Sequence, residues 1–128
     1  MSLDEYLDLF RKAMEKFEKY GYADIVEIRE EVRANKQAVL IAKVVLIDNS
    51  ILHIKEYIDA KYGIDRVSYA YQYQDRTDQL IFRYDNAAHR PALGFKEHRH
   101  SSDGKIYEAA LPDIFDLVDE ILSHLMNS

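Results

Sequence analysis

Runs of β-branched and aromatic residues follow one another through the middle of this chain, with short polar breaks between them. A parallel strand pair needs a crossover of about a dozen residues or more, whereas an antiparallel pair needs only a turn. The first two breaks, 34–36 and 48–49, cannot hold a crossover helix. Consecutive strands must therefore be antiparallel neighbours. The predicted strands span residues 23–33, 37–47, 50–60, 66–74 and 80–85.

Amphipathic segments lie before and after these strands. The first spans residues 3–20, begins with a capping-box pair of Ser2 and Glu5, and stops at Gly21. Pro112 opens the second, whose apolar residues recur at helical spacing from Ile114 onward. Helices with one apolar stripe pack that stripe on a sheet. We predict an α+β fold in which both helices cover one face of a five-stranded antiparallel meander.

Length and composition restrict the class of protein. A chain of 128 residues suits a single domain, 1–128. It has no cysteine, which excludes disulfides and thiolate chemistry and predicts a reducing compartment. We expect a cytoplasmic protein, because the sequence shows no signal peptide and no apolar stretch long enough to span a membrane. The net charge of −6 argues against broad nucleic-acid binding, although cations slightly outnumber anions between Arg83 and Lys105.

The segment 86–111 shows no sustained periodicity, and long segments of this kind inside a small domain are usually functional or disordered. It contains His89, His98 and His100. Histidines at neutral pH can act as a base and an acid, so with arginines to hold a phosphate they suit metal-independent RNA cleavage without a cofactor. Two or three imidazoles with Asp85 or Asp103 would also suit a divalent transition metal. The remaining interpretation is a polar loop with exposed histidines.

Aromatic residues alternate along two predicted strands. Tyr69, Tyr71 and Tyr73 share one face, as do Phe82 and Tyr84. Such a face can stack RNA bases, which makes Tyr71 and Tyr84 candidate substrate contacts. It can equally form an aromatic layer under the helices or in a dimer interface.

Glu56 is predicted to point with apolar Leu52, Ile54 and Ile58, where a carboxylate must be paired, protonated or at the edge of the core. Such a group is a candidate general base with a raised pKa. A β-bulge that shifts the register is the alternative.

One stretch of the sequence resembles a known family. Residues 71–86 read YQYQDRTDQLIFRYDN, followed by AAHRP and, further on, by F at 95 and HRH at 98–100. This is similar to the TumE family, whose pattern has Tyr-His-Tyr-Gln-Asp, then Leu-Ile-Phe-Arg-Tyr-Asp-Asn-Ala-Pro-His-His-Pro, and later Phe-Pro-His-His-Lys-His. Residues 80–87 match letter for letter, and KEYID at 55–59 resembles a second block. The chain departs from the pattern at Gln72, Ala88, Arg90, Lys96 and Glu97, so several family histidines are missing.

The resemblance implies a toxin of a type II toxin–antitoxin pair, with a cognate antitoxin of the helix-turn-helix type. For an RNA-cleaving toxin, His89 with His98 or His100 would exchange the proton, Arg83 and Arg99 would hold the phosphate, and Glu56 would orient a histidine. The competing hypotheses are a non-catalytic module whose tyrosine face forms a homodimer or binds a partner, and a histidine metal site.

Overall fold

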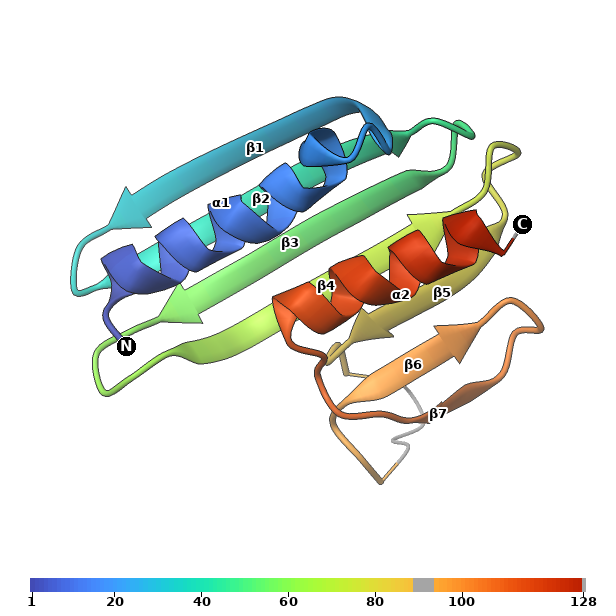
Figure 1. Ribbon diagram of the computed structural model, residues 1–128. Helices are drawn as coiled ribbons and strands as arrows, with labels where there is room; N and C mark the ends of the chain where they lie inside the picture. Colours follow the sequence, from blue (N-terminus) through green and yellow to red (C-terminus); the bar gives the residue numbers. More distant parts are fainter. Residues whose placement is uncertain (89–93, 128) are drawn as a thin grey trace.

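The strands of the sheet pair in the order in which they occur along the chain (Figure 1). The computed structural model describes residues 1–88 and 94–127. The predicted antiparallel meander is confirmed, since every neighbouring pair is antiparallel. The sheet contains β1 (Ala23–Arg33), β2 (Gln37–Leu46), β3 (Ile51–Asp59), β4 (Asp65–Gln74), β5 (Leu80–Asp85), β6 (His98–Ser101) and β7 (Ile106–Glu108).

The predicted count of five strands is wrong, because the sheet has seven. The two additional strands form a hairpin inside the segment that was expected to be irregular. They are only four and three residues long, and β6 reads HRHS, with no β-branched or apolar residue to indicate a strand. The turn between them has a recognisable signal, because Asp103 precedes Gly104, whose φ of 83° suits glycine. Pairing with β5 supplies the stability that the local sequence lacks.

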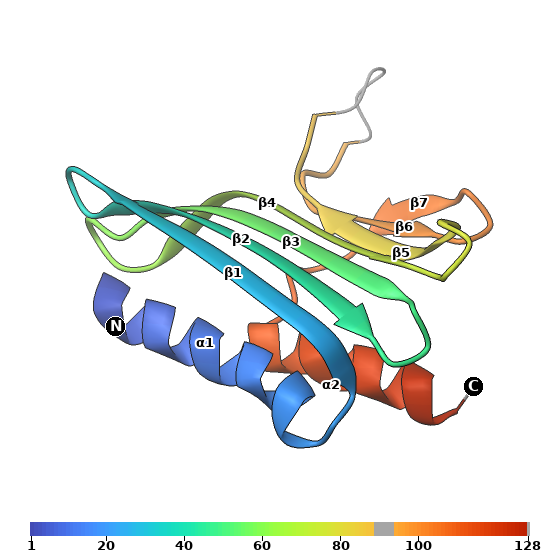
Figure 2. The same cartoon turned by 90° about the horizontal axis from the view of Figure 1, so that it is seen from above.

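Both helices lie on the same face of the sheet, as predicted (Figure 2). Helix α1 (Leu3–Lys19) begins with the expected capping box, in which the Glu5 backbone N–H donates to Ser2 Oγ at 3.1 Å. Helix α2 (Ile114–Met126) starts two positions later than expected, because Asp113 caps it and Pro112 precedes the cap. No helix among the described residues is long and apolar enough to cross a membrane.

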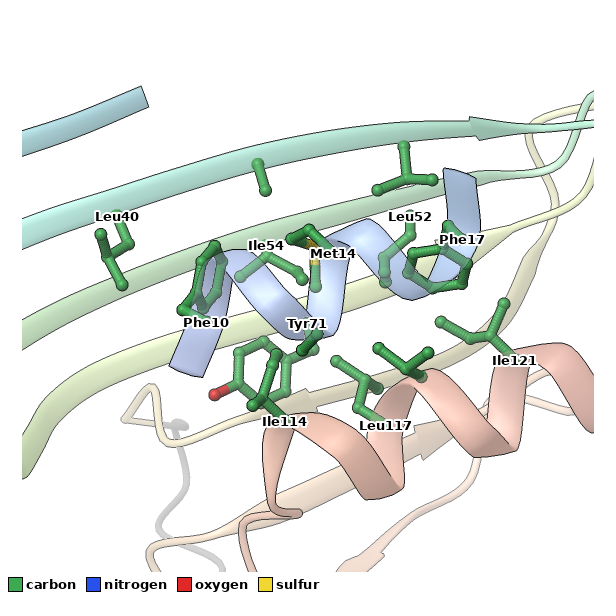
Figure 3. Close-up of a cluster of buried hydrophobic side chains, with 14 of the residues drawn as sticks. Phe10, Met14, Phe17, Leu40, Leu52, Ile54, Tyr71, Ile114, Leu117 and Ile121 are labelled. Carbon is green, nitrogen blue, oxygen red and sulfur yellow. The ribbon is translucent and has the colours of Figure 1, made fainter. Parts of the chain in front are cut away.

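The core lies between the helices and the sheet (Figure 3). Alternate residues of each central strand point into it, including Leu40 of β2, Ile54 of β3 and Tyr71 of β4. Phe10 of α1 and Leu117 of α2 meet them from the other side and are fully buried. Each such side chain contributes about 1.5–3 kcal/mol by leaving water. The helices therefore pack against only one face of the sheet.

The sheet therefore has two different faces. We call the side covered by α1 and α2 the helix face and the other side the open face. No helix covers the open face in the part of the chain that the structure describes (Figure 2). The described ends of the β5–β6 connection rise on this side of the sheet (Figure 2). A polar side chain on the open face can meet a large ligand, whereas one on the helix face meets the core.

Candidate functional site on the open face

Strand pairing gathers polar side chains on the open face of β4, β5 and β6. Residues that are direct partners across a sheet share a face. Arg83 is the partner of His100, and Asp85 is the partner of His98. We call these residues, Arg83, Asp85, His98 and His100, the open-face cluster.

Asp85 is the centre of this cluster. Its Oδ2 accepts a hydrogen bond of 2.7 Å from Arg83 Nε and lies 3.3 Å from His100 Nε2. Its Oδ1 lies 3.2 Å from His98 Nδ1. Burial disfavours the charged carboxylate, but the hydrogen bonds from Arg83 and His98 and the charge of His100 outweigh it and lower the pKa of Asp85. Asp85 is therefore an ionised carboxylate that orients the cationic and imidazole groups around it.

His98 is held rigidly and is only 2% exposed. Its Nδ1 faces Asp85, and its Nε2 lies 2.9 Å from the backbone oxygen of Phe95. These two contacts hold the ring at both of its nitrogens. This arrangement fixes the orientation of His98 and suits a structural support.

His100 and Arg83 are more accessible than His98. The His100 side chain is 19% exposed and that of Arg83 is 34% exposed, against 3% for His98. Arg83 Nη1 donates to Gln72 Oε1 at 2.8 Å while Nε binds Asp85, so its Nη2 group takes part in neither bond. These two side chains are the members of the cluster that a ligand on the open face would touch.

Further cations lie beside the cluster on the open face. In one row of strand partners, Lys43 lies opposite His53, His53 opposite Gln72, and Gln72 opposite Arg83. A shallow hollow is lined by Lys43, His53, Lys55, Gln72 and Arg83, by the acidic Glu27 and by apolar residues of β2–β4. A neighbouring hollow includes Lys55, Arg83, Asp85 and Lys96, so cations outnumber carboxylates across the two hollows. Burial, and then the nearby charge of Lys43, lower the pKa of His53. This region of an acidic protein is locally basic and suited to an anionic ligand.

The structure does not bring Glu56 to the histidines. Glu56 is completely buried on the helix face, where it accepts hydrogen bonds from the hydroxyls of Tyr6 and Tyr71. The pairing of β3 with β2 is regular at Glu56, so the bulge alternative does not apply there. Burial raises its pKa, against the opposing effects of both tyrosines and Arg66. The expected paired carboxylate is present, but the sheet separates it from the open-face cluster and Asp85 contacts the histidines instead.

The aromatic layer and Arg99 also belong to the helix face. Tyr71 is fully buried beside Ile114 and Leu117 (Figure 3), which agrees with the interpretation as a layer under the helices. The hydroxyl of Tyr84 bonds Glu120 of α2 at 2.7 Å. Arg99 donates to that hydroxyl at 2.7 Å and lies over its ring.

Tyr71, Tyr84 and Arg99 were predicted to contact substrate. Tyr71 instead lies in the core and bonds Glu56 and Arg66, whereas Tyr84 and Arg99 join the sheet to Glu120 of α2. None of them shares a face with the open-face cluster.

Two further expectations concern His89 and a metal. His89 lies outside the described residues. Among the residues that are described, no group of three or more histidine, aspartate or glutamate side chains has the geometry to hold a metal ion. The rings of His98 and His100 lie 6.4 Å apart between centroids and approach different oxygens of Asp85.

Sequence reasoning named Asp85 only as a possible metal ligand. The available signal was the alternation of Arg83 with Asp85 on one strand and of His98 with His100 in the following segment. Each pair shares a face of an extended chain, and only the pairing of β5 with β6 makes the two pairs adjacent.

Two of the residues that depart from the TumE pattern accept hydrogen bonds in the structure. Gln72 accepts from Arg83 Nη1, and Glu97 accepts from the backbone N–H of Leu111 at 2.9 Å.

Taken together, these features define a small α+β protein that carries a compact histidine–arginine–aspartate cluster on an uncovered sheet face. The family comparison assigns it more closely, because the model of the family described as Toxin TumE matches residues 10–127. The chain belongs to the TumE family, a family of toxins, and its membership implies a cognate antitoxin. No curated protein and no solved structure matches the chain.

Proposed function

We propose that this chain is a toxin that cleaves single-stranded RNA on its open face without a metal ion. The observation that carries the proposal is the Asp85 carboxylate, which contacts Arg83, His98 and His100 on a face that no described helix covers. Family membership supports the toxin role. The reaction and the substrate are our inference from the chemistry of the cluster.

In the proposed reaction, the ribose 2′-hydroxyl attacks the adjacent phosphorus, and the bond from phosphorus to the 5′ oxygen breaks. A base must take the proton of the 2′-hydroxyl, and an acid must protonate the leaving 5′ oxygen. His100 is the better placed of the two histidines in the open-face cluster, because its side chain is partly exposed and Asp85 orients it. His89 remains the predicted second proton carrier. The products are a 2′,3′-cyclic phosphate and a 5′-hydroxyl.

The surrounding cations account for substrate binding in this proposal. Arg83 would bind the reacting phosphate through the Nη2 group that its bonds to Asp85 and Gln72 leave available. Lys43, Lys55 and Lys96 line the adjoining hollows and would bind neighbouring phosphates of the strand. His98 would act as a positioning residue, because it is buried between Phe95 and Asp85.

The antitoxin would keep this face from RNA in the cell. We propose a helix-turn-helix antitoxin, on the basis of the family resemblance. An antitoxin that neutralises the toxin by covering the open face would place acidic side chains against Lys43, Lys55 and Arg83.

The test uses the full-length chain, inducible expression and a labelled single-stranded RNA oligonucleotide in buffer with EDTA. We expect growth arrest, and RNA fragments whose 5′-hydroxyl ends accept phosphate from a polynucleotide kinase. His100→Ala should reduce cleavage by a factor on the order of 10²–10⁴, the range for losing one acid–base group. His124→Ala is the matched control, because His124 lies on α2 at the helix side of the sheet.

Each outcome separates the hypotheses. Cleavage that is lost in His100→Ala and kept in His124→Ala supports the proposed site. RNA binding by the wild type without cleavage would favour the non-catalytic module. Cleavage that disappears with EDTA and returns with a divalent metal would contradict the metal-independent reaction.

A further inference from the structure

Strand β1 forms a long edge of the sheet. Within the described part of the chain it pairs with β2 on one side and with no strand on the other (Figure 1). It is 11 residues long and mostly exposed, whereas β7 at the opposite edge has three residues. Proteins usually protect long edges with proline, lysine or a bulge, because the unpaired backbone groups can bind another strand. From Ile25 to Arg33, β1 has no proline or lysine and pairs regularly with β2.

The charges of this edge are self-complementary. Glu27, Arg29, Glu31 and Arg33 alternate along the open face of β1. If two copies of β1 pair antiparallel about Glu30, position 29 faces position 31 of the second copy, and position 27 faces position 33. Every one of these charges then faces the opposite sign. Opposite charges directly across an antiparallel pair stabilise it, and like charges destabilise it.

Nearby registers are less favourable. Pairing about Arg29 would place that arginine against itself and Glu27 against Glu31. Pairing about Glu31 would place that glutamate against itself and Arg29 against Arg33. Pairing about Ile28 keeps Glu27 opposite Arg29 but leaves Glu31 opposite Ile25. The charge pattern therefore selects the register centred on Glu30.

The helix side of the same edge fits this register. Ile28 is 38% exposed and Val32 is 62% exposed. In this register, Ile28 of each copy would face Val32 of the other. Glu30 would meet its own counterpart at the two-fold axis. Arg11 of α1 already binds this carboxylate through two hydrogen bonds, of 2.7 and 2.5 Å, and offsets its charge. The apolar contacts between Ile28 and Val32 would thus lie on both sides of the central Glu30 pair, whose charge Arg11 offsets.

We propose that two copies of this chain associate edge to edge through β1, with the two-fold axis at Glu30. Such an interface is isologous and closes as a dimer. The axis is perpendicular to the sheet, so the two sheets join into one and both open faces lie on the same side. The dimer would present two open-face clusters on one continuous surface. This inference does not depend on ribonuclease activity.

The test measures the molar mass of the purified full-length chain by sedimentation velocity over a range of concentrations. We expect a dimer whose dissociation constant rises roughly tenfold or more in Arg29→Glu and in Glu31→Arg, because each change creates two like-charge pairs. The double variant Arg29→Glu/Glu31→Arg is the matched control. It has the composition of the wild type and restores opposite charges at both positions, so it should dimerise again.

A mixing experiment distinguishes a lost interface from a variant that fails to fold. Arg29→Glu and Glu31→Arg should each be monomeric alone yet form a heterodimer with one another, because position 29 of one then complements position 31 of the other. The proposal is overturned if the wild type stays monomeric at every concentration. It is also overturned if a wild-type dimer is unaffected by both single changes, or if these changes abolish antitoxin binding instead of self-association.

Discussion

Removing the carboxylate of Glu56 should destabilise the fold through two buried tyrosines. Tyr6 and Tyr71 donate their hydroxyls to Glu56, and these residues are 6% and 0% exposed. In Glu56→Ala both hydroxyls lose their acceptor, at about 1–3 kcal/mol each. The cavity adds to the loss, and relief from burying a charge offsets part of it. We expect the free energy of unfolding to fall by about 2–5 kcal/mol, a large share of a typical 5–15 kcal/mol.

The pH dependence of this effect has a definite sign. Burial raises the pKa of Glu56 above its ordinary value of about 4.3, so the folded state binds this proton more tightly than the unfolded state. The contribution to stability is fully present below the ordinary pKa. It is lost as the pH rises through the raised, folded pKa. Glu56→Gln mimics the protonated side chain, so its free energy of unfolding should increase relative to that of the wild type as the pH rises above the ordinary pKa of Glu56.

Urea unfolding followed by circular dichroism measures both effects, since the chain has no tryptophan for fluorescence. Glu15→Ala is the matched control, because Glu15 is exposed on α1 and its loss should change stability by less than about 0.5 kcal/mol. Unchanged stability in Glu56→Ala would refute the structural role. If that variant also lost RNA cleavage, the interpretation of Glu56 as a general base would regain support.

Two further predictions concern α2, one its contact with the sheet and the other its N-terminal cap. Arg99→Ala removes the bond to Tyr84 and the packing over its ring, so thermal unfolding should show a loss of about 1–2 kcal/mol. RNA cleavage per folded molecule should not change, and a selective loss of cleavage would return Arg99 to the site. Asp113→Ala removes the cap of α2 and should cost about 1 kcal/mol, whereas Asp113→Asn should be nearly neutral. Equal losses in both Asp113 variants would show that capping is not the cause.

Sequence reasoning succeeded where the signal is local. Short breaks between strands exclude crossovers, and the capping box of Ser2 and Glu5 marks the start of α1. Alternation along β4 correctly put Tyr71 in a layer of side chains on one face, although its role as core or substrate contact stayed open. The strand HRHS at 98–101 escaped detection because propensity and apolar periodicity are both absent there.

The pairing register of β5 with β6 could be known only from the tertiary structure. Alternation shows that His98 and His100 share a face, and that Arg83 and Asp85 share one, because successive side chains of a strand point to opposite sides. It does not show which face of β6 meets which face of β5. A slip of one residue in that pairing would put Arg99 beside Arg83 and send both histidines to the helix face. Pairing energy between strands, and not the pattern within either of them, decided where the cluster lies.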